Sequence, residues 1–324
     1  MIHDVKEYFG LKKDFHNTGY FETENYKQVF LDLKAAVMSG HLVALTGSVG
    51  CGKTLTARKI RDELNREGDV LASVNLAVDK DRVTLNTLML ALFTDLTAGE
   101  KNFKIPTQLE LRERQLRDLI KRRKKPVALF IDEAHDLHHK TLVRLKRLIE
   151  VIQEADSVLS IVLIGHPKLK VDLCRSAMEE IGARATILEL EGINGSERKY
   201  IDWLLGLCLK DGVQPFDVFT EAALDLMANQ LTTPLQVNSY AWKALARGHQ
   251  IGQKPVDVET LQQVFTQDLN GKEAKLHRCG YNIKSLSEAI DARPSEIRAY
   301  LHGHMAQGRS QEIQRELLKL GIAG

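Results

Sequence analysis

The stretch Gly47-Ser48-Val49-Gly50-Cys51-Gly52-Lys53-Thr54 decides the fold of this chain. It fits the pattern G-x-x-x-x-G-K-[S/T], and it lies between an apolar run at residues 41–46 (HLVALT) and a helical pattern at residues 54–66. Glycines let backbone N–H groups converge on phosphate oxygens, and the N-terminus of a helix adds the positive end of its dipole. We therefore expect a strand, a phosphate-binding turn and a helix in this order.

The residue types around this turn predict a site for Mg-ATP. The Lys53 ammonium is expected to reach the β- and γ-phosphates, and the Thr54 hydroxyl is expected to bind Mg²⁺. The predicted nucleotide-binding set extends one residue further along the helix and includes one carboxylate that follows a later strand. It comprises Gly47, Ser48, Val49, Gly50, Cys51, Gly52, Lys53, Thr54, Leu55 and Asp132.

A second apolar run, residues 127–131 (VALFI), ends in two acidic residues, Asp132 and Glu133. Carboxylates at the end of a buried strand are costly unless they are used. We expect Asp132 to complete the Mg²⁺ shell and Glu133 to polarise the attacking water. The alternative is that the two acids cap the N-terminus of a helix; their place after a phosphate-binding loop favours the hydrolytic role.

Strand and helix patterns alternate in the first two thirds of the chain, which predicts an α/β fold with a parallel sheet flanked by helices. The expected strands are residues 41–46, 70–76, 127–131, 157–164 and 185–190. The expected helices are residues 54–66, 84–96, 107–124 and 142–152, and Thr107 with Glu110 predicts a capping box for the third.

After Gly195 the strand patterns give way to helical ones, which predicts a small helical lid and a further C-terminal helical domain. The expected lid helices are residues 196–209, 220–230, 234–247 and 258–269. The predicted domains are 1–40 (leader and one helix), 41–194 (nucleotide-binding α/β domain), 195–270 (lid) and 271–324.

Composition limits the possible partners and compartment. The chain has 324 residues, 44% of them hydrophobic, and a formal net charge of +2, so a nucleic-acid partner requires a local basic patch. The four cysteines show no disulfide or zinc spacing, and the N-terminus has no signal-peptide pattern. No apolar run has the length of a membrane span. We expect a cytoplasmic protein without a membrane partner.

The last 50 or so residues resemble a repressor-type helix-turn-helix. Ser285 with Glu288 predicts a capping box for a helix at 285–290, and a second helix is expected at 294–302. The predicted shared core is Leu286, Ile290, Ile297, Tyr300 and Leu301, and the residues expected to face a DNA groove are Ser295, Glu296, Arg298 and His302. Residues 272–324 hold nine Lys/Arg and six Asp/Glu, a net charge of +3. The alternative is a helical hairpin that docks on protein, and the turn lacks the glycine often found there.

Four stretches together resemble the ExeA-like AAA+ ATPases, a bacterial group that includes transposition regulators of the TniB, TnsC and MuB type. They are Tyr8-Phe9-Gly10-Leu11, the loop 47–54, Asp132-Glu133-Ala134-His135 and Ile164-Gly165-His166-Pro167. The secretion-associated arm of this group carries a membrane span and a cell-wall-binding domain. The other arm polymerises on duplex DNA with ATP and stimulates a transposase, and this chain fits that arm better.

The resemblance implies further parts of an ATPase site. His166 stands where AAA+ proteins carry sensor 1, although it could equally be a loop histidine before Pro167. Arg184 is the expected arginine finger reaching a neighbouring subunit, with Arg175 as the other candidate and a surface role as the alternative. The place of sensor 2 has no arginine; Gln236 or Asn238 could substitute, which implies weak γ-phosphate sensing and slow turnover.

Basic side chains supply candidate DNA contacts. Lys80 and Arg82 lie in a polar loop that lines the DNA channel in the transposition family, and Lys140, Arg144 and Arg147 share one predicted helix face. With Arg298, these residues support the hypothesis of an ATPase that assembles as a ring or filament on double-stranded DNA and recruits a transposase or targeting protein. The alternatives are a phage or plasmid replication loader, a secretion ATPase, or an ATP-switched adaptor with little hydrolysis.

Overall fold

The structure, a computed structural model, describes residues 2–74, 83–98, 103–175, 178–268, 276–277, 279–301, 305, 307–320 and 322. Its internal contacts divide the chain into two units. The sheet unit comprises Glu24–Gly47 and Lys53–Leu190, and the helical unit comprises Met1–Thr23, Ser48–Gly52 and Glu191–Gly324. This grouping divides the predicted leader 1–40, because its first part packs with the helical unit.

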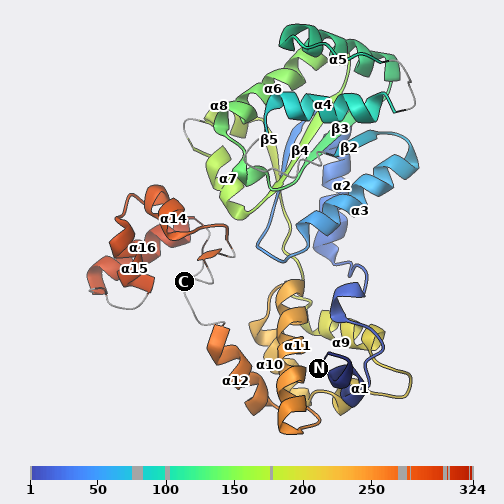
Figure 1. Cartoon of the computed structure of the whole chain (residues 1–324). Helices are drawn as coiled ribbons and strands as arrows, with labels where there is room; N and C mark the ends of the chain where they lie inside the picture. Colours follow the sequence, from blue (N-terminus) through green and yellow to red (C-terminus); the bar gives the residue numbers. More distant parts are fainter. Residues whose placement is uncertain are drawn as a thin grey trace. The chain divides into compact units, whose positions relative to one another are not determined.

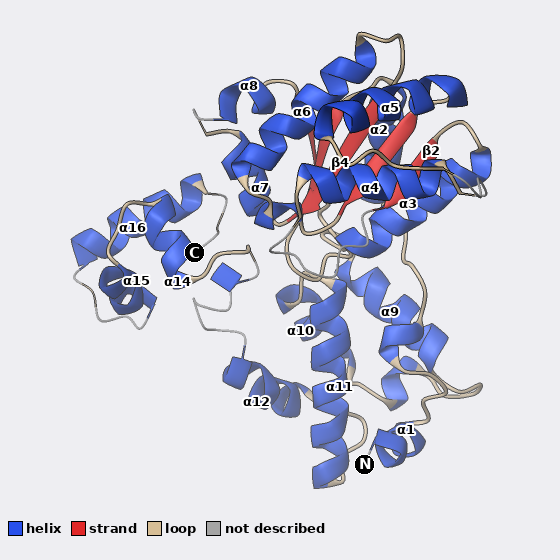
Figure 2. Cartoon of the chain, turned by 45° about the horizontal axis from the view of Figure 1, so that its top comes forward, coloured by secondary structure: helices blue, strands red, loops and turns tan. Residues whose placement is uncertain are grey.

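A five-stranded parallel sheet forms the centre of the sheet unit, in the order β2-β3-β4-β1-β5 (Figures 1 and 2). Every residue of β1, β3 and β4 is buried, as expected for apolar strands covered on both faces. The predicted fold class is confirmed. The strands are β1 (Leu42–Thr46), β2 (Leu71–Val74), β3 (Val127–Ile131), β4 (Leu159–Gly165) and β5 (Ala185–Glu189).

Helices cover both faces of this sheet, and the alternation along each strand decides which face a side chain joins. Leu129 and Ile161 belong to the core cluster formed with α4, α5 and α6. On the other face, the Ser160 hydroxyl donates to the Val37 carbonyl of α2 at 2.7 Å. The helices of this unit are α2 (Glu24–Met38), α3 (Lys53–Glu67), α4 (Leu85–Leu96), α5 (Leu109–Arg123), α6 (His139–Gln153), α7 (Pro167–Leu173) and α8 (Glu179–Gly182).

The capping box predicted for α5 is wrong. The helix begins at Leu109, two residues later than expected, and its N-cap Gln108 makes no side-chain capping bond. The Arg112 guanidinium instead donates to the Pro106 carbonyl at 3.0 and 2.9 Å and to the Thr107 carbonyl at 3.3 Å. These bonds keep Thr107 outside the helix and satisfy the carbonyls ahead of its first turn.

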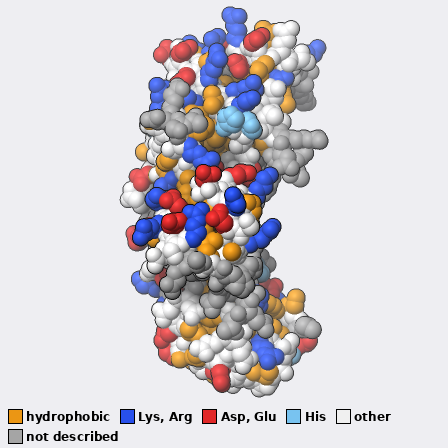
Figure 3. All heavy atoms as spheres, turned by 90° about the vertical axis from the view of Figure 1, so that its left-hand side faces the viewer, with side chains coloured by type: hydrophobic (Ala, Val, Ile, Leu, Met, Phe, Trp, Pro, Cys, Tyr) orange, Lys and Arg blue, Asp and Glu red, His pale blue; other side chains and the backbone are white. Residues whose placement is uncertain are grey.

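The outer face of α6 carries the predicted basic row. Lys140, Arg144 and Arg147 are all exposed, as expected for residues spaced at i, i+4 and i+7. Figure 3 shows acidic and basic side chains intermixed on the face that it presents, in keeping with the low net charge. The predicted DNA contacts Lys80 and Arg82, and residues 75–76 of the second predicted strand, lie outside the described residues.

The predicted lid helices are present in the helical unit as α9 (Glu197–Cys208), α10 (Glu221–Gln230), α11 (Pro234–Ile251) and α12 (Val258–Asp268). They share one core with α1 (Ile2–Phe9), a helix that was not predicted. Val5 and Phe9 are its buried residues, one turn apart. Leu11 then pairs with Leu209 in an antiparallel bridge, so the N-terminal segment belongs structurally to the lid helices.

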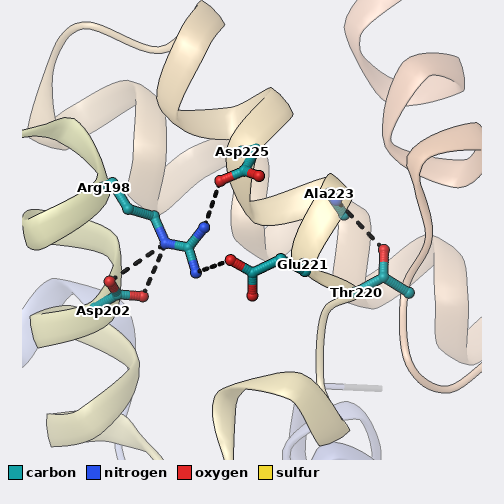
Figure 4. A network of polar contacts seen from close by, with 6 residues as sticks. All are labelled: Arg198, Asp202, Thr220, Glu221, Ala223 and Asp225. Carbon is teal, nitrogen blue, oxygen red and sulfur yellow. Dashed lines mark hydrogen bonds and ion pairs between the residues drawn. The ribbon is translucent and has the colours of Figure 1, made fainter.

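One arginine joins two of these helices (Figure 4). Arg198 of α9 contacts Asp202 on its own helix at 3.1 Å and reaches Glu221 and Asp225 of α10 at 2.9 and 2.5 Å. Burial by itself would lower the pKa of the Arg198 guanidinium, but its hydrogen bonds and its attraction to Asp202 and Glu221 outweigh burial and raise it. The guanidinium fork therefore holds α9 and α10 together through several charge-assisted bonds.

The C-terminal cluster consists of α14 (Ile283–Ala289), α15 (Pro294–Leu301) and α16 (Gln307–Lys319) around a core of its own. Of the predicted core, Leu286, Ile297 and Tyr300 are buried, and Ile290 and Leu301 are partly buried against them. This arrangement is compatible with a helix-turn-helix, which stays a prediction.

Two details of this cluster differ from expectation. The predicted capping box of Ser285 with Glu288 is wrong: Asn282 is the N-cap and forms a capping box with Ser285, because asparagine is a strong N-cap one turn earlier. The turn contains no glycine at its left-handed position, because Asp291 adopts that conformation with a φ of 49°. The predicted DNA contact Arg298 is exposed, and His302 lies outside the described residues.

Candidate nucleotide-binding and active site

Three strands carry the candidate site at their carboxyl ends. In the sheet β4 lies between β1 and β3, with Thr46 opposite Gly165 and Ile131 opposite Leu163. Continued for two residues, this parallel register places Glu133 level with the end of β4. The crevice beyond the carboxyl ends of parallel strands is where open α/β sheets bind ligands.

The phosphate-binding loop has the backbone that its glycines allow. Gly50 and Gly52 take positive φ values of 82° and 99°, and α3 begins immediately after them at Lys53. The Lys53 side chain is 8% exposed, and its Nζ donates to the Gly47 carbonyl at 2.9 Å. The lysine that the motif assigns to the phosphates therefore lies buried against its own loop, while Leu55, the last residue of the predicted set, is 47% exposed.

Thr54 and Asp132 meet directly. The Thr54 hydroxyl donates to Asp132 Oδ2 at 2.8 Å, and Asp132 Oδ1 accepts from the Glu133 backbone N–H at 2.9 Å. A hydroxyl and a carboxylate oxygen are ligands that Mg²⁺ prefers, and these two come together from α3 and the end of β3. The donor set thus fits the predicted magnesium site.

Glu133 stands at a strained point of the chain. Its φ of 53° is left-handed, which costs a non-glycine residue about 1–2 kcal/mol. The turn that this conformation makes leads from β3 into a short 3-10 helix at Ala134–Asp136. Glu133 Oε2 then lies 3.4 Å from His135 Nδ1 and 3.8 Å from His166 Nε2.

The two histidines form a pair beside this carboxylate. Their ring centroids are 4.0 Å apart with an interplanar angle of 55°. Burial lowers the pKa of His135, and Lys168 and Lys53 lower it further, while Asp136 and Glu133 act in the opposite direction. Burial, the largest of these effects, therefore favours the neutral form of His135.

Gly165 makes room for this pair. A Cβ at that position would lie 3.1 Å from Leu169 Cδ2 and 3.3 and 3.4 Å from the backbone N and the Nδ1 of His135. The close approach of β4 to the segment after β3 thus depends on a missing side chain. We did not predict a role for His135 from the sequence; the signal was the glycine that ends β4 beside a histidine that follows the acidic pair.

Comparison with known proteins supports the fold. Residues 37–171 match the family model described as AAA domain. The chain has the P-loop AAA+ fold. Over most of their length, two solved structures are similar to it, each at low sequence identity, so the likeness concerns the fold. Among curated proteins, none matches the chain.

The first of these structures is Cdc6p from Pyrobaculum aerophilum, with a TM-score of 0.52 and 16% identity over 98% of this chain and 85% of that one. The second is the ORC2 protein of Aeropyrum pernix in ADPNP–ADP complexes, with a TM-score of 0.54 and 14% identity over 96% and 85%. None of the helices that the structure describes combines the length and apolar character needed to cross a membrane.

His166, at the predicted sensor 1 position of the AAA+ fold, directly follows β4 and precedes Pro167, the first residue of α7. As the N-cap residue of α7 it makes no side-chain capping bond, and its Nε2 lies 3.8 Å from Glu133. The ring is thus placed beside the predicted catalytic carboxylate. Its function as a sensor stays a prediction.

Arg184, the predicted finger, lies just before β5 with a side chain that is 65% exposed. Its Nη1 contacts Glu150 Oε1 at 2.7 Å, and Lys146 reaches the same oxygen at 3.3 Å. An ion pair this exposed is worth about 0.2–1 kcal/mol, so a stronger partner could displace it. Arg175, the other candidate, follows the end of α7; it is 51% exposed and pairs with Asp172, three residues earlier.

The two sensor 2 candidates already have structural roles in the helical unit. Gln236 closes the capping box of α11, where its Oε1 accepts from the backbone N–H of Thr233 at 3.2 Å. Asn238 donates to the Phe15 carbonyl at 3.2 Å and accepts from the Tyr200 hydroxyl at 3.0 Å. Burial raises the pKa of Tyr200 to about 12, so this hydroxyl remains a donor throughout the physiological range.

Proposed function

We propose that this protein binds Mg-ATP at the carboxyl edge of its sheet and hydrolyses it. The single observation that carries the proposal is the 2.8 Å hydrogen bond between Thr54 and Asp132, beside Lys53 and Glu133. These residues come from separate parts of the sequence, and their types match the needs of a triphosphate with its metal. The ADPNP–ADP complexes of the similar ORC2 structure support nucleotide as the ligand.

Each residue has a distinct task in this site. Lys53 offsets the charge of the β- and γ-phosphates, and Thr54 and Asp132 would hold Mg²⁺, which withdraws charge from the same oxygens. Glu133 accepts a hydrogen bond from the attacking water and draws off its proton. His166 is close enough to Glu133 to keep the carboxylate directed towards that water.

Single-turnover hydrolysis in a Glu133→Gln variant tests this function. We expect nucleotide binding to persist and turnover to fall by roughly 10²- to 10⁴-fold, the range for loss of a general base. Glu154→Gln, which removes an exposed carboxylate at the end of α6, is the matched control and should leave turnover unchanged. Equal, measurable rates in wild type and Glu133→Gln would show that Glu133 is not the catalyst. Negligible hydrolysis in both would favour the adaptor that switches with ATP.

Assembly is the second part of the proposal. Arg184 is exposed on the sheet unit and forms a surface ion pair with Glu150, a contact weak enough to be exchanged for the nucleotide site of a neighbouring copy. We infer a homo-oligomer, either a ring or a filament, in which double-stranded DNA lies against basic residues such as Arg144 and Arg298. ATP favours assembly, and its hydrolysis releases the subunits from DNA.

The biological setting rests on the four stretches that resemble the transposition regulators. We propose that the assembled protein marks target DNA and recruits a transposase or a targeting protein. A role in replication is the alternative, and it is compatible with the same AAA+ fold.

DNA binding with and without a non-hydrolysable ATP analogue tests the assembly. We expect rings or filaments on duplex DNA with the analogue and neither without nucleotide, as seen by electron microscopy and by sedimentation. DNA binding that ignores nucleotide would count against the ATP-controlled assembly. Stimulation of a transposase encoded beside the gene would support the transposition role over the replication role.

A further inference from the structure

Beside the predicted magnesium site lies a second group of potential ligands. Glu133, His135 and His166 each offer a ligand atom, and these atoms all lie within 4.8 Å of one another. The two separations from Glu133 Oε2 are 3.4 Å to His135 Nδ1 and 3.8 Å to His166 Nε2. A tetrahedral zinc ion with bonds of about 2.0–2.1 Å holds its ligand atoms about 3.3–3.4 Å apart, so small side-chain movements would complete the geometry.

The surroundings of His135 support a ligand role for its Nδ1. This atom is buried, and no described residue forms a hydrogen bond with it. The other ring nitrogen, Nε2, lies 3.6 Å from Asp136 Oδ1. Metal-bound histidines usually donate their second N–H to a carboxylate, which fixes the ring and makes it a better ligand.

The charges around the cluster also allow a cation. Lys53 and Lys168 are near enough to influence His135, but Glu133 and Asp136 oppose them, and Asp132 adjoins Glu133. An imidazole binds metal through an unprotonated ring nitrogen. Two imidazoles and one carboxylate suit zinc, whereas Mg²⁺ prefers oxygen ligands in an octahedral shell.

We propose that Glu133, His135 and His166 form a zinc site separate from the Thr54–Asp132 magnesium site, and that zinc there blocks ATP hydrolysis. Three protein ligands leave the fourth zinc position to water. With its Oε2 bound to the metal, Glu133 can no longer take a proton from the attacking water. The inhibition rests on the proposed function of Glu133, but zinc binding itself does not.

Zinc titration of the full-length protein without nucleotide tests the site. A competing chromophoric chelator should report about one tight zinc ion per chain. His135→Gln and His166→Gln should each abolish this tight binding. Asp136→Asn, which keeps all three ligands, should weaken it by roughly 10- to 100-fold. Thermal unfolding of each zinc-free variant checks that it folds.

The matched control is the neighbouring histidine pair at the start of α6. His138 and His139 are exposed, with ring centroids 4.3 Å apart, and could bind zinc at the surface. We expect the double variant His138→Gln/His139→Gln to bind zinc as tightly as the wild type. Tight binding that survives His135→Gln, or that is lost with the His138/His139 pair, would overturn the proposal.

Turnover with saturating Mg-ATP tests the consequence. Added zinc should inhibit the wild type, a zinc-selective chelator should restore activity, and Asp136→Asn should need correspondingly more zinc. Turnover that zinc leaves unchanged or raises in a protein with zinc bound would overturn the inhibition. A protein that binds zinc as predicted but never hydrolyses ATP would instead refute the proposed function, so the two failures are distinguishable.

Discussion

The carboxyl edge of the sheet and the C-terminal cluster differ in how the fold brings polar and charged side chains together. At the sheet edge, Lys53, Asp132 and His166 are far apart in sequence, and the parallel register brings them to one place. In the C-terminal cluster the helices are neighbours in sequence, and their apolar residues meet in a core. The polar residues left outside, such as Arg298, are not gathered by any strand end. At the sheet edge, the position of a residue at a strand end therefore indicates its function. On the C-terminal helices, the function of an exposed residue depends on which macromolecule binds there.

The largest effect that would sharpen this comparison concerns Arg184. If it completes the site of a neighbour, Arg184→Ala should reduce DNA-stimulated turnover by roughly 10³-fold or more, because a finger stabilises charge only in the transition state. Arg175→Ala is the matched control, since that arginine is similarly exposed but pairs with Asp172, only three residues earlier in the chain. Equal losses in the two variants would remove Arg184 from the site.

Mixing two inactive variants distinguishes a finger from a residue that acts in its own subunit. Glu133→Gln subunits keep Arg184, and Arg184→Ala subunits keep Glu133. A mixture should therefore contain interfaces with both groups intact and recover part of the activity. A mixture as inactive as its components would show that Arg184 does not act across the interface.

The next effect compares the two candidate DNA surfaces. The logarithm of the DNA association constant falls linearly with the logarithm of the salt concentration, and each lost phosphate contact should decrease the magnitude of that negative slope by about 0.9. We expect the α6 triple variant Lys140→Ala/Arg144→Ala/Arg147→Ala to make the slope less steep by the equivalent of about three phosphate contacts. Arg298→Ala should make it less steep by the equivalent of about one contact. Fluorescence anisotropy over a salt series measures both. An unchanged slope in Arg298→Ala, with the triple variant affected, would assign the C-terminal cluster to a protein partner.

The strands and the main helices were predictable because their signals are local and strong. Residues 127–131 are wholly apolar and are followed by two acids, and β3 has these bounds. Element ends were less predictable because several residues compete for the cap. Asn282 precedes Ser285 by one turn and takes the N-cap of α14, and Arg112 holds the carbonyls ahead of α5.

The site was predictable only where a motif names a residue. The phosphate-binding loop and the acidic pair that follows residues 127–131 together imply that Thr54 and Asp132 lie close together, and the two are hydrogen-bonded. The proximity of His135 to Glu133 follows instead from a left-handed residue and a missing Cβ at Gly165, neither of which a spacing pattern expresses. The helix α1 was not predicted for a similar reason: its two buried residues pack against the helices α9 to α12, which follow much later in the sequence.

A smaller effect tests the packing that places His135. Gly165→Ala should lower the free energy of unfolding by about 1–3 kcal/mol, because the added Cβ meets His135 and Leu169. Gly206→Ala in α9 is the control: nothing lies within 4 Å of its Cβ, so the change should stabilise the helix by about 0.5–1 kcal/mol. Chemical denaturation measures both. A neutral Gly165→Ala would mean that the contact between β4 and His135 adjusts freely.

The smallest effect tests the turn of the C-terminal cluster. Asp291 has a φ of 49°, and Asp291→Gly removes the strain of that conformation while giving the unfolded chain more freedom. These two effects oppose each other, so the free energy of opening measured by hydrogen exchange at the amides of residues 283–301 should change by less than about 1 kcal/mol. Asp291→Val keeps the demand for a left-handed residue and adds a branched Cβ, so it should clearly destabilise the same amides. If both variants exchange like the wild type, the conformation of the turn does not hold α14 against α15, and the cluster depends on its apolar core.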